Sequence, residues 1–128
     1  MITTEGSDAE KWRDLVNRCP QNDIFFTPEY ALAFEATEEE TRRDFGGEAQ
    51  LFLYGDEQNY IIYPFFQRRI SELSFAELLP PESKDWWDII SPYGYSGPLA
   101  NISETELEGS LWQSFWEEFR NYRLRSNE

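Results

Sequence analysis

The sequence predicts an α+β fold in which a small antiparallel sheet is packed by helices. Two segments with helical spacing open the chain, two apolar, aromatic-rich runs joined by a short turn follow, and the longest helical pattern comes last. The predicted order is α-α-β-β-β-α. With 128 residues, of which 40% are hydrophobic and 17% aromatic, residues 1–128 have the length and apolar content for a single domain with a core.

The first predicted helix spans Ser7 to Arg18. Ser7 and Glu10 match a capping box, and Pro20 follows the end of the pattern. One side of this helix is apolar, at Trp12, Leu15, Val16 and Cys19. Cys19 therefore reads as a small buried hydrophobic residue rather than as a catalytic thiol.

A second helix is predicted from Pro28 to about Thr37. Thr27 precedes it as an N-cap, Pro28 suits the first helical position, and Glu29 favours the positive end of the helix dipole.

The predicted sheet begins with a hairpin. Residues 48–54 and 59–70 form its strands around the turn 55–58, and Pro64 inside the second strand predicts a bulge or an edge position. A loop over 71–85 with one short helical turn near 75–79 leads to a third strand, Trp86 to Ile90.

The last predicted helix covers Glu104 to Leu124. Ser103 and Glu106 form a capping box before an aromatic and aliphatic repeat. The apolar residues with helical spacing are Leu107, Leu111, Trp112, Phe115, Trp116, Phe119 and Tyr122.

Charge and composition exclude several function classes. Twenty-five acidic against eleven basic residues give a formal charge of −14, which disfavours binding to nucleic acid or to an anionic membrane surface. The chain has no histidine, so it holds neither a Ser-His-Asp triad nor an imidazole zinc site, and we predict no metal. One cysteine allows no intramolecular disulfide. No run approaches the ~20 apolar residues of a spanning helix, which predicts a soluble, cytoplasmic protein without membrane insertion.

An aromatic loop after the third strand is the first candidate site. Glycine and proline favour a defined backbone path that presents two tyrosines. The loop residues are Ser91, Pro92, Tyr93, Gly94, Tyr95, Gly97 and Pro98. Tyr93 and Tyr95 either stack on a sugar or other planar-faced acceptor or close the end of the core.

Charged residues near this loop are the second set of candidates. Asp88 lies in an apolar strand, as a general base or as a structural acceptor for loop amides. Arg68 either grips an anionic acceptor group or pairs with a local carboxylate. Strand alternation places Arg68 and Arg69 on opposite faces.

Three segments carry a family resemblance: Asp23 to Tyr30, Tyr60 to Phe65 and Trp87 to Leu99. Together with the element order, they resemble the amino-terminal part of the GNAT acyltransferase superfamily, most closely its FemAB-like branch and BioF2-like relatives. The resemblance covers roughly residues 8 to 125. It implies a partial GNAT-like fold whose carboxy-terminal half is absent from this chain.

One departure from the family concerns the coenzyme. Acetyl-CoA users of the superfamily carry a glycine-containing loop before the central helix, whose amides wrap the pyrophosphate. Here Pro98 lacks an amide donor, the spacing differs, and Glu104 and Glu106 place negative charge at the helix start. We therefore expect no cofactor in this chain, and an acyl-CoA or aminoacyl donor only in a full-length protein.

The resemblance implies the acceptor-side or scaffolding part of an acyl- or aminoacyltransferase that acts on an amine and is inactive alone. The alternative is a non-catalytic binding or interaction module on the same scaffold. The expected partner is the missing carboxy-terminal half, or a second copy bound through an exposed edge strand.

Overall fold

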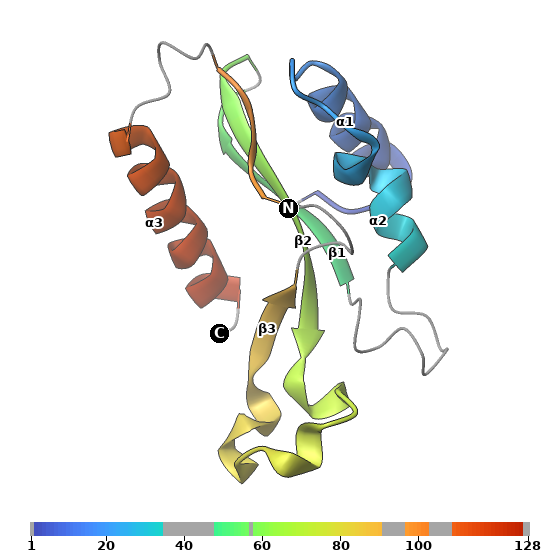
Figure 1. Cartoon of the computed structure of the whole chain (residues 1–128), viewed down its shortest axis with the longest axis vertical. Coiled ribbons are helices and arrows are strands. Elements are labelled where there is room, and N and C mark those ends of the chain that lie inside the picture. Colours follow the sequence, from blue (N-terminus) through green and yellow to red (C-terminus); the bar gives the residue numbers. More distant parts are fainter. Residues whose placement is uncertain (1, 35–47, 57, 91–96, 103–108, 127–128) are drawn as a thin grey trace.

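The computed structural model describes residues 2–34, 48–56, 58–90, 97–102 and 109–126. Over these residues the chain is an α+β fold, as the sequence predicts, with a four-stranded antiparallel sheet between helices (Figure 1). Its helices and strands are α1 (Gly6–Asn17), α2 (Pro28–Phe34), β1 (Glu48–Gly55), β2 (Tyr60–Arg69), β3 (Trp87–Ile90), β4 (Leu99–Asn101) and α3 (Gly109–Ser126).

Strand β2 is the centre of the sheet. The whole of β1 pairs with residues 60–67 of β2, from Glu48 opposite Gln67 to Gly55 opposite Tyr60. On the other side, β3 pairs with residues 66–69 and β4 with residues 60–62. Strands β3 and β4 thus lie in line along one side of β2. The sequence predicts only the first of these two strands.

The position of Pro64 follows from this topology. Pro64 lies opposite Leu51, whose N–H points outward and donates to the carbonyl of Ile2 at 2.9 Å. Residue pairs in an antiparallel ladder alternate between hydrogen-bonded and non-hydrogen-bonded. The backbone of Pro64 therefore makes no hydrogen bond to β1 and points to the other side of β2. Pro64 lies in the part of β2 between residues 60–62, which pair with β4, and residues 66–69, which pair with β3. Among the described residues no strand pairs with Pro64 on that side, and the ladder with β1 continues through Pro64 without a bulge.

Helices α1 and α2 cover one face of the sheet (Figure 1). The side chains of Tyr60, Ile62 and Phe66 in β2 enter this core, and the hydroxyl of Tyr60 donates to the carbonyl of Leu15 at 2.5 Å. The indole N–H of Trp12, which is fully buried, donates to the carbonyl of Phe26 at 2.8 Å. Trp12, Leu15, Val16 and Cys19 are all buried, so the predicted apolar side of the first helix is confirmed.

Helix α3 covers the opposite face with aromatic side chains. Phe115 and Phe119 are buried against rings of β1 and β2, with Phe52 to Phe119 and Tyr63 to Phe119 ring centroids both 5.1 Å apart. Edge-to-face pairs dominate, as the quadrupoles of aromatic rings favour. The sheet therefore separates two cores, a mixed core under α1 and α2 and an aromatic core under α3.

The structure tests two of the predicted N-caps, and one of them is wrong. Thr27 caps α2 as predicted, accepting from the Tyr30 N–H at 3.2 Å. The capping box at Ser7 is wrong: α1 begins at Gly6 after Glu5, no side chain caps it, and Ser7 lies inside the helix. The predicted last residues of the second helix, 35–37, and the predicted cap at 103–106 lie outside the described residues.

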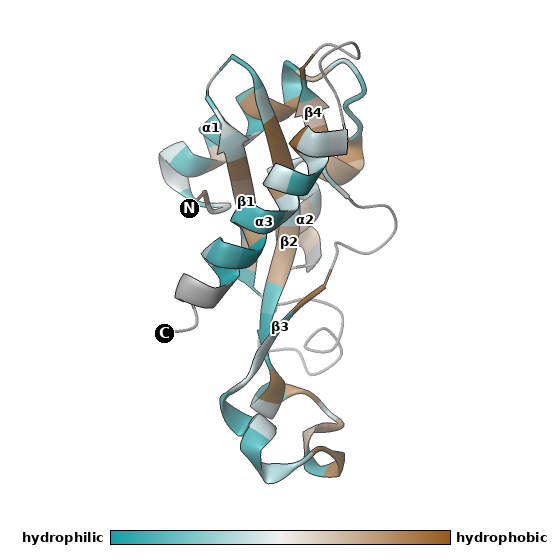
Figure 2. Ribbon diagram, turned by 90° about the vertical axis from the view of Figure 1, so that its left-hand side faces the viewer, coloured by the Kyte–Doolittle hydropathy of each residue, from teal (hydrophilic) through white to brown (hydrophobic). Residues whose placement is uncertain are grey.

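Between β2 and β3 the chain forms a small lobe of three 3-10 helices. These are η3 (Ile70–Glu72), η4 (Ala76–Leu78) and η5 (Pro81–Asp85). The predicted short turn near 75–79 corresponds to η4, and the other two were not predicted. Figures 1 and 2 show the lobe projecting beyond the three helices, at the end of the sheet where β2 and β3 meet it.

Candidate functional site

Arg68 and Asp88 form a bidentate ion pair across β2 and β3. They are register partners, and their side chains point to the same face of the sheet. Arg68 Nε donates to Asp88 Oδ1 at 2.9 Å, and Arg68 Nη2 donates to Oδ2 at 2.5 Å. The Arg68 side chain is 12% exposed and the Asp88 side chain 34%. Fork-to-fork geometry of this kind is the strongest form of a guanidinium–carboxylate contact.

This pairing favours one of the two roles expected for each residue. Both oxygens of Asp88 accept hydrogen bonds from Arg68, so Asp88 is engaged as a structural acceptor. The partner that the structure describes is an arginine side chain, while the amides of residues 91–96, which the sequence suggested, lie outside the described residues. The Arg68 guanidinium likewise forms a salt bridge with a local carboxylate, the second of the two roles expected for it.

Arg69 points to the other face, as strand alternation predicts. Its guanidinium lies over the ring of Trp87, its register partner, 4.9 Å from the ring centroid. The two adjacent arginines therefore serve different faces, one in an ion pair and one in a cation–π contact.

Arg123 of α3 also reaches this end of the sheet, which the sequence did not predict. Its Nη1 donates to Gln67 Oε1 at 2.8 Å, and its guanidinium lies 5.8 Å from the Phe65 ring centroid. Burial lowers the pKa of Arg123, and the nearby Tyr122 and Asp88 oppose that shift. The contact joins residues 56 positions apart, so only the docking of α3 on the sheet creates it.

The aromatic loop is described only at its end. Ser91, Pro92, Tyr93, Gly94 and Tyr95 lie outside the described residues, so their predicted roles stay predictions.

Gly97 and Pro98 are described and lie directly before β4. Gly97 has a φ of +142°, a conformation that favours glycine, and a Cβ there would meet no atom within 4 Å. Glycine is thus favoured at Gly97 by its backbone angle and not by space.

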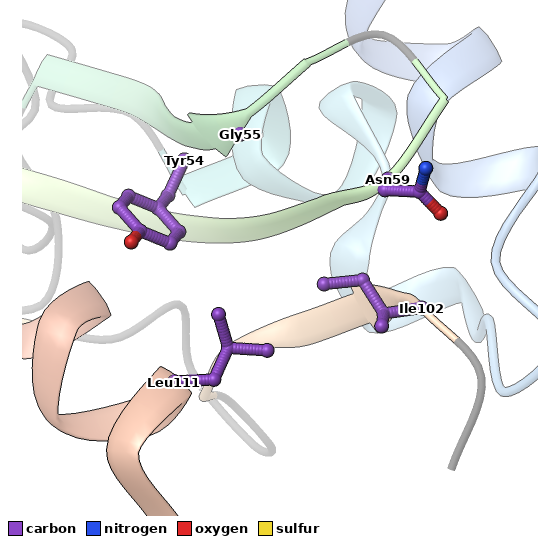
Figure 3. Close-up of a pocket in the computed structure, with 5 residues that line it drawn as sticks. All are labelled: Tyr54, Gly55, Asn59, Ile102 and Leu111. Atoms are coloured by element: carbon purple, nitrogen blue, oxygen red, sulfur yellow. The ribbon is translucent and has the colours of Figure 1, made fainter. Parts of the chain in front are cut away.

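A pocket lies at the opposite end of β2 from Arg68. It has a volume of about 370 Å³ and is lined by the hairpin turn, the residue after β4 and the start of α3 (Figure 3). Its lining residues are Tyr54, Gly55, Asn59, Ile102 and Leu111. The lining is mainly apolar with few polar groups, which suits a small apolar group. Sequence reasoning missed it because three segments distant in the chain form it.

A second pocket of about 300 Å³ lies beside the outer edge of β1. Its lining residues are Ile2, Lys11, Leu51, Phe52, Leu53 and Tyr122. Burial raises the pKa of the Tyr122 phenol, whose oxygen is buried without a hydrogen-bond partner among the described residues.

Within the described ranges, no three His, Cys, Asp or Glu side chains lie close enough together to hold a metal ion. None of the helices in the described part of the chain combines the length and hydropathy that a bilayer-spanning segment needs.

Searches against known protein families, curated proteins and solved structures gave no match to this chain. The GNAT-like character therefore rests on the sequence segments that carry the resemblance and on the element order, and it stays a prediction.

Proposed function

We propose that this chain is the amino-terminal, acceptor-side or scaffolding part of a GNAT-related acyl- or aminoacyltransferase that acts on an amine acceptor, and that it has no turnover alone. The observation that carries the proposal is the path from β4 to α3. Strand β4 lies on one side of β2, and after it α3 packs over the aromatic face of the sheet.

This path leaves a defined place for a further strand. A helix that follows a strand and packs on the sheet leads, by the right-handed crossover rule, to a parallel strand beside the first. Ala100 of β4 and Ile61 form a non-hydrogen-bonded pair, which lies between two hydrogen-bonded pairs. The backbone N–H and C=O of Ala100 therefore point away from β2. In the described residues no strand pairs with that outer side of β4. A following strand would extend the sheet there, as the family resemblance implies.

The acceptor side is proposed at the end of β3. The loop that carries Ser91, Tyr93 and Tyr95 starts directly after Ile90, two residues beyond Asp88. We propose that the Arg68–Asp88 pair fixes this strand end, so that the tyrosines form one wall of an acceptor site. In that arrangement Arg68 and Asp88 are positioning residues, because they engage one another.

The donor, an acyl-CoA thioester or an aminoacyl ester, would be bound by the remaining part of the protein. Pro98 has no N–H to give to a pyrophosphate, and the proposed reaction takes place in the cytoplasm, where such donors are made.

The second candidate is a non-catalytic interaction module on the same scaffold. The observation that favours it is the bidentate pairing of Arg68 with Asp88, in which both oxygens of the Asp88 carboxylate accept from the guanidinium.

Donor assays on the isolated chain test the proposal. We expect no transfer from acetyl-CoA, longer acyl-CoA or aminoacyl-tRNA to amine acceptors by the chain alone, and transfer by the longer polypeptide that carries it. Robust turnover by the isolated chain would refute the half-domain assignment. A longer polypeptide that folds, but neither binds nor uses any of these donors, would favour the interaction module.

A further inference from the structure

The lobe between β2 and β3, residues 70–86, is ordered by its own contacts. Its two ends meet at the sheet, where the Ile70 N–H donates to the carbonyl of Trp86 at 2.9 Å. Inside it, Leu73 and Ser83 are buried, and the Ser83 hydroxyl donates to the carbonyl of Pro80 at 2.6 Å. Helix η3 packs against both η4 and η5. The lobe therefore has a defined structure held by its own hydrogen bonds and packing.

This ordered lobe nevertheless exposes large apolar side chains. Leu78 is 87% exposed, the most exposed of the large hydrophobic residues described, and Trp86 and Phe75 are exposed as well. Half of the exposed large hydrophobic residues in the described chain fall within these seventeen positions. Figure 2 shows the hydrophobic colouring at the tip of the lobe, remote from both cores. Solvent-facing apolar groups gathered on a preformed projection are typical of an interaction site.

The charge of the lobe restricts the kind of partner that can cover its apolar side chains. Four acidic residues, Glu72, Glu77, Glu82 and Asp85, are exposed within the same seventeen positions, against one basic residue, Lys84. A lipid surface with anionic headgroups is repelled by this charge. A second lobe would bring like charges together, in a chain that carries −14 in total. A partner that covers the apolar residues must instead offer positive charge around its own apolar pocket.

We propose that the lobe over residues 70–86 docks into an apolar pocket rimmed by lysine and arginine on a partner protein, with Leu78 as the inserted side chain. Glu77 and the other acidic residues of the lobe then meet the basic rim. This surface lies at the opposite end of the molecule from the hairpin turn and does not depend on the proposed transferase role.

Two synthetic peptides test the required chemistry. An amphipathic helical peptide of leucine and lysine is titrated into the isotope-labelled chain, with a leucine and glutamate peptide as its control. We expect NMR shift changes concentrated in residues 70–86 with the lysine peptide only. Leu78→Ser should weaken that binding about tenfold or more, because the apolar side chain that the partner covers is lost. Leu32→Ser, on exposed α2 surface, should leave it unchanged. Shift changes spread over the whole acidic surface, or equal effects of the two variants, would overturn the proposal.

Photocrosslinking in the source cells tests the natural partner. A benzoylphenylalanine in place of Ala76 should crosslink to a protein that the same probe in place of Ala33 does not reach. The identified protein, once purified, should bind the wild-type chain, lose about tenfold in affinity with Leu78→Ser, and bind more weakly in 0.5 M salt. Crosslinking only to a second copy, binding to phosphatidylcholine vesicles instead, or affinity that ignores Leu78→Ser would each contradict it.

Discussion

At the scale of single residues, the Arg68–Asp88 pair joins two strands of the sheet through two charged hydrogen bonds. Its side chains are 12% and 34% exposed, whereas those of the Arg13–Glu29 pair between α1 and α2 are 45% and 56% exposed. Water and salt screen an exposed pair far more than a half-buried one. A comparison of the two pairs therefore tests how much burial adds to the coupling free energy of an ion pair.

We predict a coupling free energy of about 1–2 kcal/mol for Arg68 and Asp88, because both charged hydrogen bonds are lost together. Arg68→Ala and Asp88→Ala, singly and combined, are measured by urea unfolding. The same cycle on Arg13 and Glu29 should give less than about 1 kcal/mol. Equal couplings in the two cycles would show that the burial of Arg68 adds nothing.

Tyr60 sets a second prediction at this scale. Burial raises the pKa of its phenol above the usual value of about 10. The unfolded chain then loses the Tyr60 proton at a lower pH than the folded chain does. Stability from this group is complete below pH 10 and falls as the pH rises above it. Tyr60→Phe should reduce that alkaline loss, and should cost about 1 kcal/mol at pH 7 through the hydrogen bond to Leu15.

The measurement is the free energy of unfolding at pH 7 and at several values above 10. Tyr122 and Cys19 also have pKa values raised by burial, so part of the alkaline loss remains in the variant. An unchanged pH dependence in Tyr60→Phe would exclude Tyr60 as a source.

At the scale of elements, the two predicted caps behave differently. The Thr27 hydroxyl donates to the carbonyl of Ile24 at 2.7 Å and accepts from the Tyr30 N–H at the start of α2. Near α1, Asp8 accepts from both the N–H and the hydroxyl of Thr3, a contact that ties the helix to the chain before it. Ser7 has no part in capping.

We predict that Thr27→Ala costs about 1 kcal/mol, the usual value for a lost N-cap. Ser7→Ala should change stability by less than about 0.5 kcal/mol, since it alters an exposed helical position. Thermal and urea unfolding of both variants measure the difference. A larger loss for Ser7→Ala would restore the capping box that the sequence suggested.

At the scale of the whole molecule, the outer side of β4 is the sheet edge on which the transferase proposal places a further strand. Unpaired strand edges template pairing with another strand, and the proposed occupants are a strand of a longer polypeptide or a second copy of this chain. The charge of −14 opposes the second-copy arrangement at low ionic strength and less so in salt.

We therefore predict that the isolated chain self-associates more strongly as salt rises, as measured by light scattering at high concentration. Ala100→Pro should weaken this association, because it removes a donor that points to the open side of β4 and leaves the bonded pairs with β2 in place. Far-UV circular dichroism serves as the folding control. A monomer at every salt concentration would count against this edge as a dimer surface.

Much of the fold follows from the sequence at short range. The apolar spacing of Trp12, Leu15 and Val16 and the hairpin around residues 55–59 are local patterns, and the structure confirms both. The extra strand β4 was missed because three residues carry too little pattern to be recognised alone. Its existence depends on the free side of Tyr60 to Ile62 being available for pairing.

The candidate site was only partly accessible from sequence. Arg68 and Asp88 were both identified, but their partnership depends on the register of β2 against β3. Arg123 escaped notice because its partner, Gln67, lies on a different element. Distances of 20 to 56 residues along the chain separate these pairs, well beyond any local periodicity.

The sequence by itself determined the α+β class, the apolar faces of the helices, the hairpin and the chemistries that a chain without histidine excludes. These properties depend on neighbours within about one or two helical turns or across one tight turn. The tertiary structure alone decided that Arg68 neutralises Asp88, that two cores occupy the two sheet faces, and that an apolar lobe projects beyond them. Those outcomes depend on strand order and helix docking, which bring together residues whose separation in sequence carries no signal.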